Sequence, residues 1–246
     1  MASPGRGSIS QKRSRAPSAD AAPAGAFFGR RKGHPLRAQQ AALFDTLLPR
    51  LALDPAAPLT ADLRALFRSG TDELRLEIGF GGGEHLLAQA EAQPAAGFIG
   101  CEPFVNGMAK ALAGIAARDL TNIRLHFGDA VDLLTWLPDG ALASIDLLYP
   151  DPWPKRRHWK RRFVQAERIA AFARVMRSGG AFRFASDIPD YVAWTLALFT
   201  RSADFEWTAE RADDWRLPWQ GFTPTRYQAK AKREGRTPCY LVFRRR

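Results

Sequence analysis

The stretch YPDPWPKRRHWKRRF, residues 149–163, places one carboxylate, Asp151, between two prolines and directly before a run of basic residues. Proline fixes the backbone φ angle and removes a hydrogen-bond donor, so this carboxylate is held in one direction. The run contains Lys155, Arg156, Arg157, Lys160, Arg161 and Arg162, with Trp153 and Trp159 interleaved. Such cations neutralise phosphates, and an aromatic ring can stack on an unstacked base. A charge run is commonly a solvated surface, but its position beside Asp151 favours contact with RNA or DNA.

Four more carboxylates follow apolar segments in the same way: Glu77, Glu102, Asp129 and Asp187. Packing of a hydrophobic core does not require an acidic side chain at these positions. Glu77 precedes the glycine run Gly79-Phe80-Gly81-Gly82-Gly83, where glycine lets the backbone turn sharply and approach a ligand closely. We therefore expect a ligand site built from these acids and the glycine run, with a helix cap or an ion-pair partner as the alternative role for Glu77.

The segments that must position these residues alternate between strand and helix patterns. Residues 73–92 pass from a short strand through the glycine run into a helix. Further strands are predicted at 96–102, 122–129, 142–151 and 180–187, helices at 37–53, 103–120, 130–138, 162–178 and 188–202, and closing strands at 204–210 and 239–245. This alternation predicts an α/β fold with a doubly wound, mostly parallel sheet and an antiparallel closing strand. In such sheets ligands bind beyond the carboxyl ends of the strands, where all five acids are expected.

The spacing of the glycines discriminates between nucleoside cofactors. Glu102 follows the glycine run at the distance where an acid binds ribose hydroxyls. A dinucleotide site needs a further glycine at the position that Glu84 holds, and a carboxylate there would repel a pyrophosphate. No lysine follows the glycines as it does in a P-loop. S-adenosylmethionine carries a positive sulfonium and no phosphate, so acidic surroundings suit it.

Composition narrows the partners. The net charge of +11 indicates a polyanionic partner, and no apolar run is long enough to span a bilayer. Residues 1–34 are rich in Arg, Ser and Pro without a secretory signal, so we expect a disordered basic arm before one domain at 35–246 in a cytoplasmic protein. Cys101 and Cys239 stand apart, and the four histidines have no metal-ligand spacing, so no metal is expected. Nothing calls for an obligate protein partner.

Together, LEIGFGGG, FIGCE, GDAVDLL, LLYPDPWPKRRHWKRRFVQ, ASD and TRYQAKAKREGR resemble the bacterial-type tRNA (guanine-N7-)-methyltransferases over roughly residues 35–246. The resemblance implies a Rossmann-like class I fold that uses S-adenosylmethionine to make 7-methylguanosine in the tRNA variable loop. It implies that Glu77, Gly79, Gly81, Glu102, Asp129 and Asp151 line the cofactor. It further implies that the substrate is bound by Lys155, Asp187, Thr225, Arg226, Tyr227 and Gln228.

One residue departs from the family pattern. The family tetrad usually ends in glutamate, and here Thr225-Arg226-Tyr227 is followed by Gln228. An amide offers one acceptor oxygen and its own donors, so it satisfies only part of the pattern that a carboxylate gives to two donors. Two interpretations stay open: guanine binds more weakly, or another acid such as Asp187 takes this role.

The chemistry expected here needs no strong base, because guanine N7 carries an in-plane lone pair and no proton. Alignment of N7, methyl and sulfur supplies most of the acceleration, and Asp151 is the candidate for orienting the reactants and stabilising the positive charge. Three alternatives stay open. One is methylation of another base or atom, including an exocyclic amine, since Asp151-Pro152-Trp153 resembles the D-P-P-Y/W loop. The others are a non-catalytic RNA-binding protein with a vestigial cofactor pocket and, disfavoured by Glu84, a nicotinamide dehydrogenase.

Overall fold

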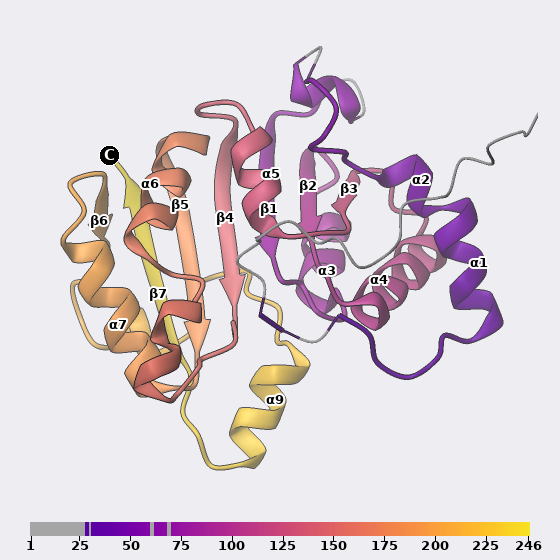
Figure 1. Ribbon diagram of the computed structural model, residues 1–246. Coiled ribbons are helices and arrows are strands. Elements are labelled where there is room, and N and C mark those ends of the chain that lie inside the picture. The colour runs from indigo at the N-terminus through magenta and orange to yellow at the C-terminus, as the bar shows by residue number, and fades with distance from the viewer. Residues whose placement is uncertain (1–27, 30, 60–61, 68–69) are drawn as a thin grey trace, which may run out of the picture.

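The computed structural model describes residues 28–29, 31–59, 62–67 and 70–246, and these residues build a seven-stranded sheet (Figure 1). The strand order is β3-β2-β1-β4-β5-β7-β6. The strands are β1 (Glu73–Ile78), β2 (Ala96–Cys101), β3 (Ile123–His126), β4 (Leu142–Leu148), β5 (Met176–Ser186), β6 (Phe205–Trp207) and β7 (Cys239–Arg245). β1 to β5 pair in parallel, and β7 is antiparallel to both of its neighbours. The predicted mostly parallel sheet with an antiparallel closing strand is confirmed.

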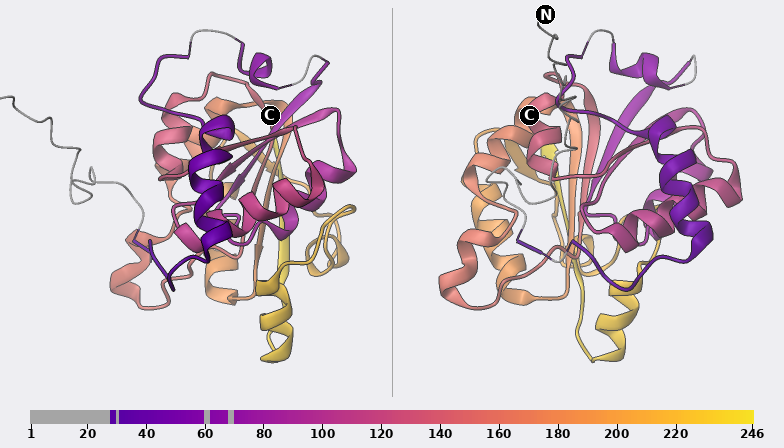
Figure 2. Two further views of the ribbon diagram at one scale, coloured as in Figure 1. Left: turned by 90° about the vertical axis from the view of Figure 1, so that its right-hand side faces the viewer. Right: turned by 45° about the vertical axis from the view of Figure 1, so that its right-hand side comes forward.

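Helices cover both faces of the sheet, which gives three layers (Figure 2). One face carries α3 (Glu84–Ala92) and α4 (Val105–Arg118), with α1 (Ala38–Thr46) outside α4 and α2 (Leu48–Leu51) beside the edge strand β3. The other face carries α5 (Ala130–Trp136), α6 (Ala166–Val175) and α7 (Pro189–Thr200). This arrangement follows from right-handed crossovers between parallel strands: the chain runs from β1 to β2 and β3 in one direction along the sheet and from β3 to β4 and β5 in the other, which places α3 and α4 on one face and α5 and α6 on the opposite face. None of the helices in the described residues has the length and apolar character needed to cross a bilayer.

Stacked phenylalanines fix the closing strand against the parallel sheet. Phe182 of β5 stacks on Phe172 of α6 and Phe199 of α7 at centroid distances of 4.8 and 4.6 Å. Phe243 of β7 stacks on Phe199 at 4.2 Å. All four rings are fully buried, and each contributes roughly 1.5–3 kcal/mol relative to exposure. The antiparallel strand is therefore anchored by side-chain packing as well as by its ladder.

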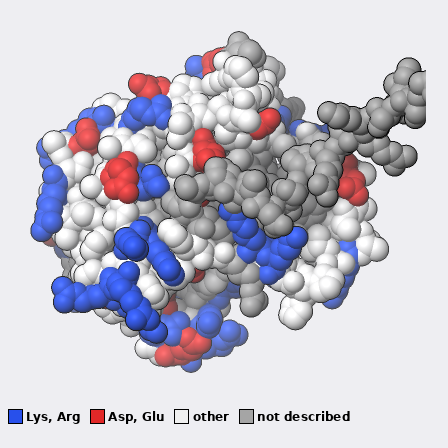
Figure 3. All heavy atoms as spheres, in the orientation of Figure 1, with Lys and Arg blue, Asp and Glu red and all other residues white. Residues whose placement is uncertain are grey.

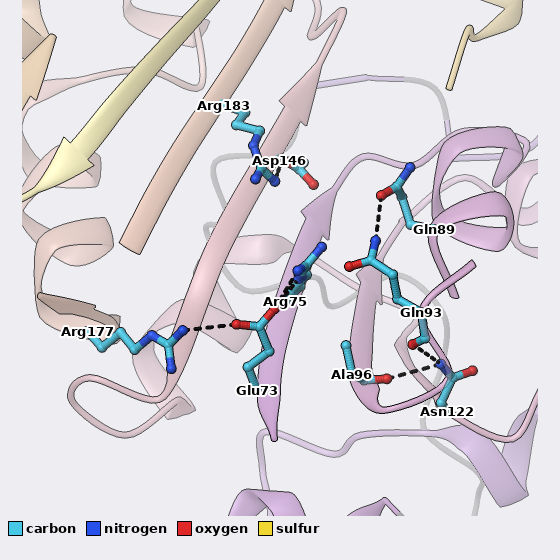
Figure 4. A network of polar contacts seen from close by, with 9 residues as sticks. All are labelled: Glu73, Arg75, Gln89, Gln93, Ala96, Asn122, Asp146, Arg177 and Arg183. Atoms are coloured by element: carbon cyan, nitrogen blue, oxygen red, sulfur yellow. Dashed lines mark hydrogen bonds and ion pairs between the residues drawn. The ribbon is translucent and has the colours of Figure 1, made fainter. Parts of the chain in front are cut away.

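Polar contacts organise the amino ends of the strands and the neighbouring loops (Figure 4). Glu73 at the start of β1 accepts hydrogen bonds from Arg75 and, at 2.9 Å, from Arg177. Buried Asn122 donates to the carbonyls of Ala96 and Gln93 at 3.0 and 3.2 Å, which closes the turn between α3 and β2. These contacts lie away from the carboxyl ends of the strands, which remain available for a site.

Several predicted boundaries were wrong. The helix predicted at 162–178 ends at Val175, because buried Met176 already pairs with Leu142 as the first residue of β5. Gly179 and Gly180 therefore do not close a helix but lie within β5, where the register shifts and Gly179 adopts φ 77°. The helix predicted at 37–53 is divided at Leu47 into α1 and α2.

Four short elements were missed, and two of them carry the basic clusters. They are the 3-10 helices η1 (Leu63–Leu66) and η2 (Arg156–Arg161) and the α-helices α8 (Asp213–Arg216) and α9 (Arg226–Arg233). In Figure 1, α9 lies beyond the carboxyl ends of the parallel strands. Residues 1–27, most of the basic arm expected at 1–34, lie outside the described residues.

Candidate active site

A cavity of about 300 Å³ opens at the carboxyl ends of β1, β2 and β4. The strand order reverses between β1 and β4, so this is the switch point at which doubly wound sheets bind ligands. Five residues predicted to contact a cofactor line the cavity: Gly79, Gly81, Glu102, Asp129 and Asp151. The fold therefore brings together residues that are spread over more than seventy positions of the sequence.

The glycine run forms a tight loop between β1 and α3. Gly79, Gly81 and Gly83 have φ angles of 69°, 58° and 82°, which residues with a Cβ rarely adopt. Glu102 fixes this loop, because its Oε2 accepts a hydrogen bond of 2.7 Å from the Gly81 amide. Its Oε1 accepts a second one, of 2.9 Å, from the Phe104 amide. Burial raises the pKa of Glu102, and these two bonds oppose that rise.

Asp129 occupies the turn between β3 and α5. It is the N-cap of α5, and its Oδ1 accepts a hydrogen bond of 3.0 Å from the Val131 amide. Its side chain is buried, and both Asp129 and Ala130 line the cavity. The Asp129 carboxylate thus forms a polar part of the cavity wall.

Asp151 lies in a segment whose two ends are strained. Tyr149 and Trp153, the second residues on either side of Asp151, adopt left-handed φ angles of 52° and 44°. Each such non-glycine residue costs on the order of 1–3 kcal/mol, and strain of this kind concentrates at functional sites. The Asp151 side chain is exposed at the cavity mouth, yet the cavity wall removes part of its hydration and raises its pKa.

Glu77 does not line this cavity. Its buried carboxylate pairs with Nδ1 of His85 on α3 at 3.0 Å. Burial raises the pKa of Glu77. The pKa of His85 is lowered by burial but raised overall by the charge of Glu77. The strand register sets Glu77 beside Asp146 and Asp146 beside Arg183, so the pair belongs to a row of charged groups across the sheet. The spacing of the histidines in the sequence did not predict this pair, because Glu77 lies on β1 and His85 on α3.

The predicted substrate residues separate into two groups. Tyr227 lines the cavity, and Arg226 lies beside it with its guanidinium carbon 4.9 Å from the Tyr227 ring centroid. Thr225 caps α9 by accepting a hydrogen bond of 3.2 Å from the Gln228 amide. Lys155 is exposed immediately before η2.

Asp187 and Gln228 do not line the cavity. Asp187 accepts a hydrogen bond of 2.5 Å from Nε of Arg236. Gln228 is buried, and its Nε2 donates to the hydroxyl of Tyr240 on β7. Both side chains thus have protein partners on the segment that holds α9 against the sheet.

Sequence patterns missed one wall of the cavity, which comes from the segment expected to be a free arm. Phe28 and Gly29 line the cavity together with Trp153 and Arg161. The guanidinium carbon of Arg161 lies 5.3 Å from the Phe28 ring centroid and 5.0 Å from that of Trp153. The same segment is tied to α4, since the Gly33 amide donates to Oδ1 of Asn106 at 2.8 Å. The aromatic residues of this segment were the available signal.

Basic side chains flank the cavity on two elements. The exposed cations are Lys155, Arg156, Arg157 and Lys160 in and beside η2, and Lys230, Lys232 and Arg233 on α9. Figure 3 shows Lys and Arg side chains gathered on the lower part of one face, toward the end where α9 lies. Within the described part of the chain, no group of three or more His, Cys, Asp or Glu side chains could hold a metal ion.

The chain matches a protein-family model described as "Putative methyltransferase" over residues 71–241. A relative from Rhodopseudomonas palustris (strain BisA53), named tRNA (guanine-N(7)-)-methyltransferase, is 65% identical over 221 residues, which are 90% of this chain and 88% of the relative. One of the same name from Bradyrhizobium diazoefficiens is 62% identical over 220 residues, 89% and 93% of the two chains. The crystal structure of the 16S rRNA methyltransferase KamB aligns with a TM-score of 0.53 at 17% identity, over 73% of this chain and 91% of that one, so the class I methyltransferase fold is shared. The chain is therefore a methyltransferase and belongs to the tRNA (guanine-N(7)-)-methyltransferase family.

Proposed function

We propose that the protein transfers the methyl group of S-adenosylmethionine to N7 of a guanine in the variable loop of tRNA. The observation that carries this proposal is the position of Asp151, which lies at the mouth of an acid-lined cavity and directly before the basic residues of η2. Relatives that are more than 60% identical carry the corresponding name. A cationic cofactor on one side and a polyanionic substrate on the other suit this distribution of charge.

The residues of the cavity fit S-adenosylmethionine, which supplies an electrophilic methyl group when it is bound. The Glu102 oxygens each accept one backbone amide hydrogen bond and keep a lone pair for ribose hydroxyls. Asp129 is suited to accept from an amino group, and Gly79 and Gly81 leave room for close backbone approach. Glu84 stands in the first turn of α3, where a pyrophosphate would otherwise bind. In this proposal Glu77 does not contact the cofactor but supports the glycine loop through its pair with His85.

The protein's part in the reaction is to align its two substrates and exclude water. Guanine N7 needs no proton removed, so the carboxylate of Asp151 orients the reactants and stabilises the positive charge that develops on the purine. Tyr227 and Trp153 at the cavity rim offer ring faces for the base, and Lys155 with Arg226 offers charges for phosphates. Thr225, Asp187 and Gln228 support this surface through their contacts within and beneath α9.

A nucleoside-resolved methyl-transfer assay tests the proposal. The protein is incubated with labelled S-adenosylmethionine and an unmodified tRNA transcript, and the digested product is identified by mass spectrometry. We expect 7-methylguanosine in the variable loop. A transcript that carries 7-deazaguanine in that loop lacks the accepting atom and serves as the matched control.

Other outcomes identify which part fails. Methyl on an exocyclic amine or on another base would overturn the assignment of the atom. Binding of tRNA and cofactor without transfer would favour an RNA-binding protein. Failure of the folded protein to bind S-adenosylmethionine would overturn the proposed role of the cavity.

A further inference from the structure

Arg162 differs from the other cations of the basic run because its side chain is fully buried. Its relative exposure is 1%, whereas Arg161 is half-buried and Arg156, Arg157 and Lys160 of η2 are exposed. Burial of a guanidinium is costly unless its donors and its charge are met by the protein. A buried arginine in a run that otherwise faces solvent therefore requires an explanation from its contacts.

An aromatic cage surrounds the guanidinium. Its central carbon lies 4.8 Å from the ring centroid of Trp159, 5.0 Å from that of Tyr191 and 5.3 Å from that of Trp194. Cation–π contacts of this kind strengthen when they are shielded from water. Tyr191 and Trp194 belong to α7, so the cage connects η2 to the helix that packs beside β5.

The polar contacts of Arg162 show which parts of the chain it connects. Its Nε donates a hydrogen bond of 2.9 Å to the carbonyl oxygen of Pro152, the residue that follows Asp151. Its Nη2 pairs with the Asp190 carboxylate on α7. One guanidinium thus ties the backbone next to Asp151 to a rigid helix. The strained segment between Tyr149 and Trp153 needs such an anchor, because its φ angles are unfavourable without one.

We propose that Arg162 is a positioning residue that fixes the Asp151-Pro152 backbone and so sets the direction of the Asp151 carboxylate. This inference rests on the proposed function, in which Asp151 aligns the reactants. Misplacement of a catalytic group by about 1 Å can slow a reaction by a factor on the order of 10². Arg162 therefore acts on the methyl-transfer step rather than on the binding of tRNA phosphates, unlike the exposed cations around it.

The test compares Arg162→Lys with Asp190→Asn as the matched control. Lysine keeps the charge but cannot reach both partners with a rigid fork. Asp190→Asn removes the charge of one partner but keeps an acceptor oxygen for Nη2, and it leaves the Pro152 contact and the cage rings of α7 in place. The single-turnover rate is measured with enzyme in excess at saturating cofactor, so that an inactive fraction does not lower it. We expect a decrease of roughly ten- to a hundredfold for Arg162→Lys and less than about threefold for Asp190→Asn, with the tRNA Kd of both near the wild-type value.

Hydrogen exchange provides a readout that does not depend on activity. The amides of Tyr149, Asp151, Trp153 and Lys155 should exchange several-fold faster in Arg162→Lys than in the wild type or Asp190→Asn, because the anchor of this segment is lost. If Arg162→Lys does not fold, Trp194→Leu and Trp194→Phe replace it, since the first removes a cage ring and the second keeps one. Equal rates and equal exchange in a variant and its control would overturn the inference. Absence of transfer by the wild type would instead refute the proposed function, while the exchange comparison would still decide the role of Arg162.

Discussion

Gly107 on α4 allows the glycine loop to approach the helix, and adding one methyl group there should weaken cofactor binding. A Cβ at this position would lie 2.4 Å from the carbonyl oxygen of Gly81 and 3.1 Å from Cγ of Glu102. Ordinary contacts of a Cβ begin near 3.4 Å. The backbone of the loop or of α4 must therefore move by about 1 Å, because neither neighbouring group is the flexible end of a side chain.

The size of the effect follows from what this movement disturbs. Overpacking typically costs about 1–3 kcal/mol, and alanine returns up to about 1 kcal/mol as the better helix former. The unfolding free energy of Gly107→Ala should thus fall by no more than about 3 kcal/mol. The displaced loop also loses the 2.7 Å bond between the Gly81 amide and Glu102. The free loop can relieve the clash by moving, and the part of the overpacking cost that returns when a bound cofactor holds the loop in place weakens binding rather than folding. Each kcal/mol of that part raises the Kd for S-adenosylmethionine by about fivefold.

Gly114→Ala on the same helix is the control. Its Cβ would lie 2.3 Å from Cδ1 of Leu87 and 3.0 Å from Nη1 of Arg118, which are the ends of flexible side chains. We expect isothermal titration calorimetry to give a wild-type cofactor Kd for this variant and a weakened one for Gly107→Ala. The reasoning is refuted if Gly107→Ala binds the cofactor as tightly as the wild type, or if both variants lose the same affinity.

Three further predictions concern charge. Asp151→Asn should lower the single-turnover rate by a factor on the order of 10². It should also flatten the acid limb of the pH–rate profile, because the wild type loses activity when acidification protonates Asp151, whose pKa is raised by burial. An unchanged profile would count against the role of Asp151. The pKa of His85 is lowered by burial but raised overall by its carboxylate partner, so its stabilising contribution is full below about pH 6.5 and is lost as pH rises through the folded-state value. The difference in unfolding free energy between the wild type and His85→Gln should therefore narrow as the pH rises above about 6.5, as measured by urea denaturation, and a constant difference would contradict the pairing. Lys155→Gln and Lys232→Gln should each reduce the slope of log K for tRNA binding against log salt concentration by about 0.7–0.9. The control Lys110→Gln on α4 should leave this slope unchanged. Equal slopes for all three variants would show that η2 and α9 do not contact tRNA.

The location of the site could be predicted because it depends on strand ends. Parallel βαβ units bring their carboxyl ends to one edge, so an acid that follows each apolar segment must lie near the others. Glu102, Asp129 and Asp151 line the cavity for this reason. Glu84 stands where a dinucleotide site has glycine, and this alone argued against a pyrophosphate-containing cofactor, without knowledge of side-chain contacts.

Side-chain partners on distant elements could not be predicted in the same way. Glu77 stands one residue before Ile78, which lines the cavity, and successive strand residues point to opposite faces. Its carboxylate therefore meets His85 on α3. Asp187 meets Arg236, which is 49 positions away, and no local periodicity reports such a contact. Helix α9 was not predicted for a different reason: its basic residues give the sequence pattern of a charge cluster, and only Gln228 and Ala231 of the helix are buried.

The prolines beside Asp151 fix its backbone and also limit pairing of its carboxylate with the neighbouring cations. Asp151 stands four positions before Lys155, and a flexible chain would let the two side chains pair, which would neutralise the carboxylate. Among the residues that the structure describes, Asp151 forms no ion pair, although the protein carries a net charge of +11. Pro150, Pro152 and Pro154 limit the backbone between the two charges, and Arg162 fixes it from within. The segment thus keeps an acid available at the cavity mouth while the adjacent cations remain free to face a polyanion.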